Sequence, residues 1–340
     1  MESASPVTLN DVADEAGVSL ATASRVLNGS TRKVADSYRE RVMAAAQRLG
    51  YAPNISAQAM ARGRANIIGL LVGDIADPYF SAITSGAMAA AEEAGLVVTV
   101  AVTGRDAERE LRTVRALRGQ RPRAIVLAGS RFSDATLDDE LTAELDGFRS
   151  TGGQVVFISQ SGLGFDTVRI ENTGASRDLG ERMASLGYRR VAIVAGPEPL
   201  ITSTERAAGF AEGFARGGGE IVRTVRGDFN RDGGFAAGEQ LAASGVSDID
   251  IVFAASDIMA VGAMSALRQA GVTPGADVGI AGFDDISTAR DVTPPLTTVA
   301  IPLESIGRSA VEQALRTDGG EAPAPVSGPI LVRESTPLRT

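Results

Sequence analysis

The chain has 340 residues, of which 44% are hydrophobic and 22% are charged, and its formal net charge is −9. This length predicts about two domains, with room for a small third one. Because the sequence contains neither cysteine nor histidine, disulfides, thiolate metal sites, imidazole ligands and a Ser-His-Asp triad are all excluded.

The first 64 residues differ in charge from the rest. They hold eight Lys/Arg and six Asp/Glu, a net charge of +2, whereas the remaining residues hold 25 and 36, a net charge of −11. A basic head on an acidic body is typical of a nucleic-acid reader joined to another domain. No apolar run approaches the ~20 residues that cross a bilayer, and residues 1–17 lack the apolar stretch of a secretory signal. We therefore expect a cytoplasmic protein with no membrane partner.

Three short helices are predicted in the head. Thr8 can cap a helix that Gly17 ends, and Ser19 can cap a second helix that continues to Leu27. A helix, a tight glycine turn and a second helix form the outline of a helix-turn-helix. The third predicted helix covers residues 36–49, with a glycine directly beyond its end.

In a helix-turn-helix, the second helix enters the DNA major groove, so its outward residues are candidate DNA contacts. Arg25 can reach the O6 and N7 atoms of guanine, and Leu20 and Ala21 can touch thymine methyl groups. Polar residues suited to phosphate contacts surround them: Ser19, Thr22, Ser24 and Asn28. The spacing alone leaves a second interpretation open, a three-helix module for contacts with another protein.

Residues 53–64 are predicted to join the head to the body. Pro53 prevents continuation of the third helix. Residues 55–61 have the pattern of about two helical turns, too short to be stable alone. This segment is either an ordinary linker or a hinge helix that folds only when it is paired and docked on DNA.

Two stretches of the head have a recognisable pattern and spacing, VTLNDVADEAGVSLATASRVLNG and RERVMAAAQRLGYAPNISAQAMARG. They resemble the N-terminus of the lactose-repressor (LacI/GalR) family of bacterial transcription regulators. The resemblance places Leu20, Ala21 and Arg25 on the family's base-reading positions. It places Met60 where the family usually has a leucine that wedges into the minor groove, and a methionine can still unstack a base step. The predicted DNA-binding set is completed by Thr8, Tyr51, Asn54 and Ala57.

From residue 65 onward, strand-like apolar runs alternate with helices. The first half has strands at 67–72, 97–102, 124–128 and 155–158 and helices at 79–94, 106–118 and 133–149. The alternation then restarts, with helices at 174–186, 203–215, 231–243 and 258–270 and strands at 191–194, 221–225, 251–254 and 278–281. A last helix, 305–315, and a strand, 329–332, are expected to cross back between the lobes.

This pattern predicts an all-α helix-turn-helix head followed by an α/β core of two doubly wound lobes. The expected domains are a head, 1–52; a linker, 53–64; a first lobe, 65–161 with 298–324; and a second lobe, 162–297 with 325–340. In open α/β sheets, ligands bind beyond the carboxyl ends of the strands. Two facing lobes form a cleft there that can close by a hinge motion.

The candidate effector-binding residues follow those strand ends. They are Asp77, Tyr79, Phe80, Ser130, Ser159, Arg206, Phe229, Ser256, Asp257 and Asp284. Taken singly, the phenylalanines also fit a core position, Asp77 a helix cap, Asp284 a solvated turn and Arg206 a surface charge; their shared location favours a site. An arginine and an aspartate that clamp a polyol, with an aromatic ring over its apolar face, bind a sugar without catalysis.

The body is similar to the family's periplasmic-binding-protein-like effector domain. The resemblance implies that the aromatics of residues 77–80 stack on the ligand and that Arg206 grips a ligand oxygen or carboxylate. It also implies that Phe229 closes over the ligand and that Asp284 holds ligand hydroxyls. Ser159-Gln160 and Ser256 depart from the residues usual in the family, which leaves the ligand class open.

Enzymatic functions lack their motifs. No G-x-S-x-G, no P-loop and no G-x-G-x-x-G after the first strand is present. We therefore predict no catalytic residue, metal or cofactor. The sequence predicts a homodimeric transcription factor, a repressor, that binds operator DNA and a sugar-like effector, with higher oligomers left open. The alternatives are a two-lobe sugar sensor whose head contacts a protein, and an extracytoplasmic sugar-binding protein, which the head and the lack of a signal disfavour.

Overall fold

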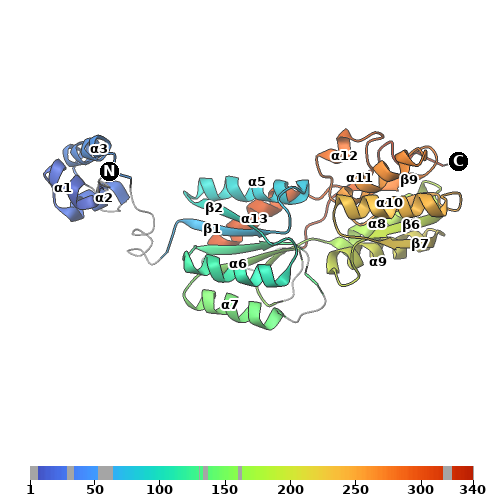
Figure 1. Cartoon of the computed structure of the whole chain (residues 1–340), viewed down its shortest axis with the longest axis horizontal. Helices are drawn as coiled ribbons and strands as arrows, with labels where there is room; N and C mark the ends of the chain where they lie inside the picture. The colour runs from blue at the N-terminus through green and yellow to red at the C-terminus, as the bar shows by residue number, and fades with distance from the viewer. Residues whose placement is uncertain are drawn as a thin grey trace, which may run out of the picture. The chain divides into compact units, whose positions relative to one another are not determined.

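The computed structural model describes residues 7–28, 34–52, 64–129, 131–132, 137–159, 163–316 and 324–339. The chain divides into two compact units, residues 1–66 and 67–340 (Figure 1). No helix within the described ranges is long and apolar enough to cross a membrane.

The described part of the head forms the helices α1 (Leu9–Ala16), α2 (Leu20–Asn28) and α3 (Asp36–Leu49). Thr8 caps α1 as predicted, since its hydroxyl accepts from the Asp11 N–H while the Asp11 carboxylate accepts from Thr8 N–H at 2.8 Å. Gly17 ends α1 in the left-handed conformation, with φ +61°. The three helices enclose a small core: Val12, Ala13, Ala16, Ala23, Val26, Val42, Ala45 and Ala46.

The first lobe of the body is built on a parallel five-stranded sheet of order β2-β1-β3-β4-β5. Its strands are β1 (Ile67–Val72), β2 (Val97–Val102), β3 (Ala124–Ala128), β4 (Gln154–Ser159) and β5 (Asp166–Arg169). Four helices cover the sheet: α5 (Pro78–Glu93), α6 (Ala107–Gly119), α7 (Asp138–Ser150) and α13 (Leu303–Leu315). In β1, Ile68, Leu70 and Val72 pack on the α5–α13 side, whereas Leu71 packs on the α6–α7 side. Burial on both faces explains the unbroken apolar run of this strand.

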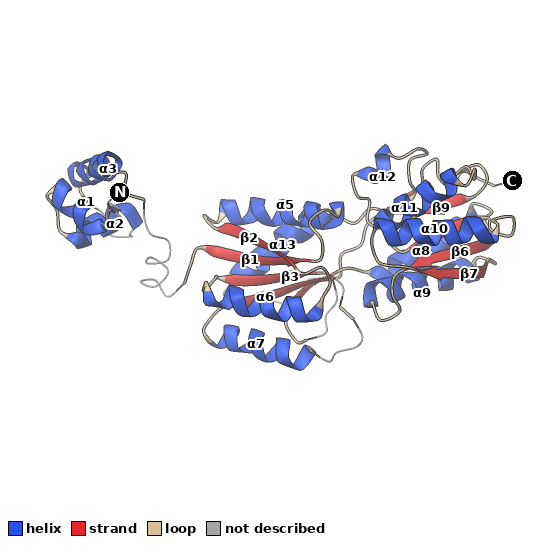
Figure 2. Ribbon diagram, viewed as in Figure 1, coloured by secondary structure: helices blue, strands red, loops and turns tan. Residues whose placement is uncertain are grey.

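Helices α5 and α13 pack closely although more than 200 residues separate them in the sequence (Figures 1 and 2). Glycines on both helices make this approach possible. A Cβ on Gly307 would lie 1.9 Å from the carbonyl oxygen of Ile83, and a Cβ on Gly86 would lie 1.9 Å from that of Glu304. Neither position accepts a larger side chain at this helix spacing.

The second lobe has a parallel sheet of order β7-β6-β8-β9. Its strands are β6 (Arg190–Ala195), β7 (Glu220–Arg226), β8 (Ile251–Ala254) and β9 (Gly279–Ala281). The helices pack as two pairs, α8 (Asn172–Ser185) with α9 (Ile201–Arg216), and α10 (Arg231–Ser244) with α11 (Asp257–Gln269) (Figure 2). A short helix, α12 (Thr288–Asp291), follows β9.

The chain passes between the two lobes in segments that bond to one another. Strands β10 (Thr298–Val299) and β11 (Ile330–Leu331) pair antiparallel. Val326 donates to the carbonyl of Arg169 and accepts from the N–H of Glu171. The last helix therefore belongs to the first lobe, while the terminal segment returns to the second.

The predicted fold class is confirmed by this architecture, but three elements were not predicted: β5, β10 and α12. Strand β5 extends the first sheet beyond residue 161, where the sequence placed the end of the first lobe. It has only four residues, with charged and exposed ends, so no apolar run marks it. The last strand is also shorter than predicted, with two residues instead of four. The predicted hinge segment, 55–61, lies outside the described residues.

Candidate functional site

A cavity of about 20 Å³ lies where the two lobes of the body face one another, and most of its lining directly follows the carboxyl ends of strands in both sheets. The first lobe contributes Asp77, Tyr79, Phe80, Arg105, Gly129 and Ser159, and the second contributes Thr202, Arg206, Phe229, Ser256 and Asp284. Ser159 Oγ lies 3.3 Å from Thr202 Oγ1, so the two lobes meet at this wall.

Arg206 and Asp284 form a buried ion pair in the second lobe. Nη2 of Arg206 lies 2.8 Å from Oδ1 of Asp284, and Nη1 lies 3.1 Å from Oδ2, which makes the pair bidentate. Arg206 also donates from Nε to Asn172 Oδ1 and from Nη1 to the carbonyl of Ala255, both at 2.9 Å. Its guanidinium stacks 4.0 Å from the Phe283 ring centre. Arg206 is thus a fixed part of the site, not a mobile surface charge.

Burial raises the pKa of Asp284 to about 6, although the attraction of Arg206 opposes this rise. Asp284 also has a positive φ of 120°, Ser159 has 114° and Arg105 has 56°. Residues with a Cβ rarely adopt this region, and each such residue costs of the order of 1–3 kcal/mol. Three strained residues therefore lie in the wall of one cavity, as is common for ligand-binding sites.

Asp77 and Tyr79 belong to the first turn of α5. Asp77 Oδ1 accepts from the N–H of Tyr79 at 3.0 Å and so caps the helix, while Pro78 occupies its first position. Burial raises the pKa of Asp77 and places that of the Tyr79 hydroxyl well above its usual range. The Tyr79 and Phe80 rings meet edge to face, with centres 5.0 Å apart. This turn presents a carboxylate and two aromatic rings to the cavity.

Asp257 does not line the cavity. Its carboxylate accepts from the Thr298 hydroxyl at 2.7 Å and from the Ile286 N–H at 3.1 Å, and the residue is fully buried. Burial raises the pKa of Asp257 to about 8, with a further contribution from the negative charge of Asp284. The geometry gives this residue a structural role, holding the loop after β9 against the start of α11.

The structure brings together the other described candidates of the effector set, whereas Ser130 lies outside the described residues. Three lining residues were not predicted: Arg105, Gly129 and Thr202. The strand-end rule could have found Arg105 and Gly129, which follow β2 and β3. Thr202 lies one helical turn before Arg206 on α9, so helical spacing could have found it.

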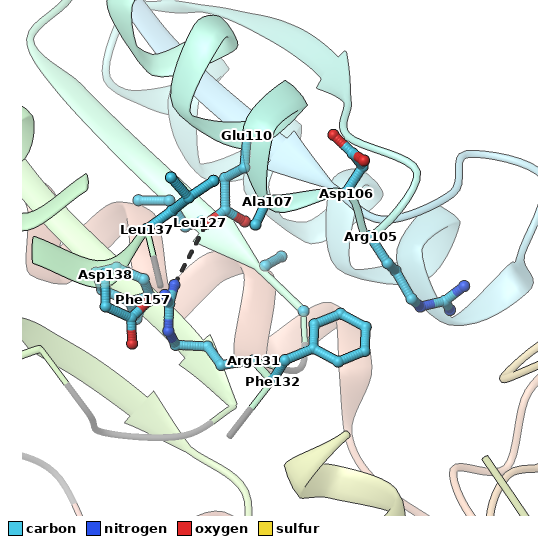
Figure 3. A pocket seen from close by; sticks show the side chains of 12 residues that line it. Arg105, Asp106, Ala107, Glu110, Leu127, Arg131, Phe132, Leu137, Asp138 and Phe157 are labelled. Atoms are coloured by element: carbon cyan, nitrogen blue, oxygen red, sulfur yellow. Dashed lines mark hydrogen bonds and ion pairs between the residues drawn. The ribbon is translucent and has the colours of Figure 1, made fainter. Parts of the chain in front are cut away.

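A second cavity of about 50 Å³ lies in the first lobe and shares Arg105 and Gly129 with the first (Figure 3). Arg131 is paired there with both Glu110, at 3.3 Å, and Asp138. Its guanidinium also lies 5.8 Å from the Phe157 ring centre. Burial raises the pKa of Glu110. The positive charge of Arg131 is therefore compensated by carboxylates of the protein itself. No cluster of potential ligands for a metal ion occurs in the described part of the chain.

In the head, the predicted base-reading residues share an exposed face of α2. Leu20, Ala21 and Arg25 are exposed, and Leu20 retains 47% of its accessible surface. Ser19 Oγ accepts from the N–H of Thr22 at 3.2 Å and so caps the helix, as predicted.

The remaining DNA-binding candidates differ in position. The Thr8 hydroxyl is engaged in the cap of α1. Ser24 is half-buried, and Tyr51 packs against the head core. The side chain of Asn28 and residues Asn54, Ala57 and Met60 lie outside the described part of the chain.

Comparison with known proteins finds a family match for each of the two units. Residues 8–54 match the profile of bacterial regulatory proteins of the lacI family, and residues 65–333 match that of periplasmic binding proteins and the sugar binding domain of the LacI family. The HTH-type transcriptional regulator CelR of Thermobifida fusca is 33% identical over 342 residues, covering 96% of this chain and 98% of the relative.

The similarity to solved structures extends over nearly the whole chain. A lac repressor dimer bound to operator and the anti-inducer ONPF has a TM-score of 0.82 and 27% identity, covering 98% of this chain and 100% of that one. A complex of CelR with cellobiose has a TM-score of 0.68 and 32% identity, covering 97% and 99%. With its helix-turn-helix head and two-lobed body, the chain belongs to the LacI family of DNA-binding transcription regulators.

Proposed function

We propose that this protein is a dimeric repressor that binds a two-fold operator and releases it when a small polar, sugar-like effector enters the cavity between the lobes. The observation that carries the proposal is the convergence of polar and aromatic residues from both lobes on one cavity. A ligand held by both lobes stabilises their closed arrangement, because it contacts each lobe only when they face one another.

The chemistry of the cavity suits a polyol. The oxygens of Asp284 and Asp77 accept hydrogen bonds from hydroxyl groups, and the hydroxyls of Ser159, Thr202 and Ser256 both donate and accept. Aromatic rings offer a face to the apolar side of a sugar ring. The cellobiose complex of the relative CelR supports a sugar-like effector.

The exposed face of α2 supports DNA reading by Arg25, with Leu20 and Ala21 beside it. One head spans only a half-site, so a dimer is needed for a two-fold operator. The operator-bound dimer of the lac repressor supports this arrangement. Residues Ser19, Thr22 and Ser24 then contact phosphates. To switch occupancy, the effector must change DNA affinity by a coupling free energy of about 1–3 kcal/mol.

Fluorescence anisotropy tests the DNA part of the proposal, with the purified full chain and a labelled duplex from upstream of its own gene. Binding is expected to weaken steeply with salt. Arg25→Ala should lose about 1–3 kcal/mol of discrimination against mutated duplexes. The matched control is Arg48→Ala, because Arg48 forms an exposed pair with Glu15, at 2.9 Å. If both variants discriminate like the wild type, Arg25 does not read bases.

The effector part is tested by a thermal-shift screen of pentoses, hexoses, disaccharides and nucleosides, followed by anisotropy with each compound that binds. At least one compound should raise the Tm and weaken binding to the duplex. Asp284→Asn should remove the thermal shift, whereas an unchanged shift would place the effector elsewhere.

A further inference from the structure

The guanidinium of Arg105 lines the effector cavity without a hydrogen bond to any residue in the described ranges of the chain. Its ion pair with Asp77 has an Nη2–Oδ2 separation of 3.6 Å, which is too long for a hydrogen bond. The side chain is only 17% exposed. A guanidinium carries five N–H donors, and donors that lose water without gaining an acceptor are unfavourable. The contrast with Arg206, whose nitrogens all donate to protein atoms, is clear.

Arg105 is held at the cavity by its backbone and by two rings. Its φ of 56° belongs to the left-handed region, and its N–H donates to Thr103 Oγ1 at 3.3 Å. The guanidinium carbon lies 5.4 Å from the ring centre of Phe80, in the first lobe, and 5.7 Å from that of Phe229, in the second. Figure 3 shows the side chain pointing away from the Glu110–Arg131 pair. The cation therefore faces the effector cavity rather than the neighbouring one.

The other charges of the cavity are already compensated. Arg206 and Asp284 neutralise each other through two hydrogen bonds. The negative charge of Asp77 caps the N-terminus of α5, whose dipole is positive at that end. Helices α9 and α11 also begin at the cavity, where they contribute Thr202 and Ser256. The starts of α9 and α11, together with one cation that has no hydrogen bond within the described ranges, leave a surplus of donors for a negatively charged oxygen group.

We propose that the effector carries a carboxylate or phosphate group that binds Arg105, on a polyol whose hydroxyls contact Asp284. The inference rests on the proposed function, which places the effector in this cavity. It makes Arg105 the residue that selects a sugar acid or sugar phosphate over the corresponding neutral sugar. Charge-assisted hydrogen bonds to a guanidinium are the strong class for such oxygens, and the nearby rings of Phe80 and Phe229 help to position the cation.

The test compares matched probes on the full chain by thermal shift and isothermal titration. The probes are inorganic phosphate against chloride at equal ionic strength, D-glucose against D-glucuronate and D-glucose 6-phosphate, and D-galactose against D-galacturonate. The variants are Arg105→Gln, which removes the charge, and Arg105→Lys, which keeps it. Arg112→Gln is the control, because it makes the same change on an exposed residue of α6 that pairs only with Glu108. Far-UV circular dichroism confirms that each variant is folded.

Phosphate is expected to raise the Tm of the wild type and of Arg112→Gln more than that of Arg105→Gln. An anionic sugar should bind the wild type at least about tenfold more tightly than its neutral counterpart. Arg105→Gln should lose this preference and Arg105→Lys should keep part of it. Equal phosphate responses of the wild type and Arg105→Gln, or equal affinity for neutral and anionic sugars, would overturn the inference.

The DNA readout separates this inference from the proposed function. If a neutral sugar releases DNA from the wild type and from Arg105→Gln alike, the proposed function stands and the anion inference fails. If phosphate raises the Tm of the wild type more than that of Arg105→Gln, but no compound changes DNA binding, the anion site stands and the switching function fails.

Discussion

The buried carboxyl of Asp257 makes the stability of the protein dependent on pH near neutrality. Its pKa is raised to about 8, from an ordinary value of 3.8, because burial disfavours the charged form. The folded protein then binds one more proton than the unfolded chain between these values. The free energy of unfolding therefore falls as pH rises through this window. The contribution is fully present below pH 3.8 and is lost above pH 8.

The expected magnitude follows from this difference. One pKa unit corresponds to about 1.4 kcal/mol, so Asp257 contributes up to about 3 kcal/mol between pH 6 and pH 8. Asp284 titrates at a lower pH, since its pKa is about 6, and it adds little in this window. Asp257→Asn substitutes a neutral amide of nearly the same shape. The variant should lose most of the pH dependence and gain stability relative to the wild type at pH 8.

Urea unfolding followed by far-UV circular dichroism at pH 6, 7 and 8 measures this effect. The control is Asp232→Asn, because the side chain of Asp232 is 90% exposed, and this variant should follow the wild type. If the unfolding free energies of the wild type and Asp257→Asn remain parallel between pH 6 and pH 8, then Asp257 is ionised throughout and the reasoning is wrong.

Three further substitutions test the packing and the caps. Arg206→Met leaves the carboxylate of Asp284 buried without its partner and should lower the free energy of unfolding, measured with urea, by about 3–5 kcal/mol. This loss should be smaller in a chain that also carries Asp284→Asn. If the losses of the two single variants simply add in the double variant, the two residues do not act as a pair. Gly307→Ala brings a Cβ to 1.9 Å from the Ile83 carbonyl oxygen. Such overpacking costs about 1–3 kcal/mol of stability, so the Tm should fall. A wild-type Tm would show that α5 and α13 can move apart without cost. Thr8→Ala removes the cap of α1 and should destabilise the head by about 1 kcal/mol, seen as faster amide exchange in α1; unchanged exchange would mean that the cap is dispensable.

Structural features that depend only on adjacent residues could be predicted from the sequence. Thr8, Gly17 and Ser19 have cap chemistry that depends on two or three adjacent residues, and the structure has these caps where the sequence predicts them. The same holds for the apolar run of β1, whose burial on both faces needs only the presence of covering helices.

Elements that depend on distant partners could not be predicted in this way. Strand β5 forms because β4 offers an edge with which four residues can pair. Strands β10 and β11 are only two residues long, and each exists through the other. Their sequences are short and mixed in polarity, so neither periodicity nor propensity distinguishes them from loops.

The sequence could predict where the site lies, but not the role of each residue within it. The strand-end rule indicated both Asp257 and Asp284, and only the structure separates them: Asp284 faces the cavity, whereas Asp257 bonds the loop behind it. Arg105 could not be singled out from the sequence, because an arginine near the start of a charged helix is usually solvated. Its importance comes from the nearby rings of Phe80 and Phe229, which lie far from it in the sequence.

The two lobes contribute to recognition in different ways. In the second lobe, Arg206 is fixed by Asn172, the Ala255 carbonyl and Asp284, so a ligand meets a preformed surface and loses little free energy in ordering it. In the first lobe, the Arg105 guanidinium forms no such bond with another described residue, and rings from both lobes lie near it. Its cation–π contacts with Phe80 and Phe229 exist together only while the lobes face one another. A ligand that binds Arg105 therefore acts on a cation whose surroundings include rings from both lobes, so ligand selection and the conformational response are coupled at this residue.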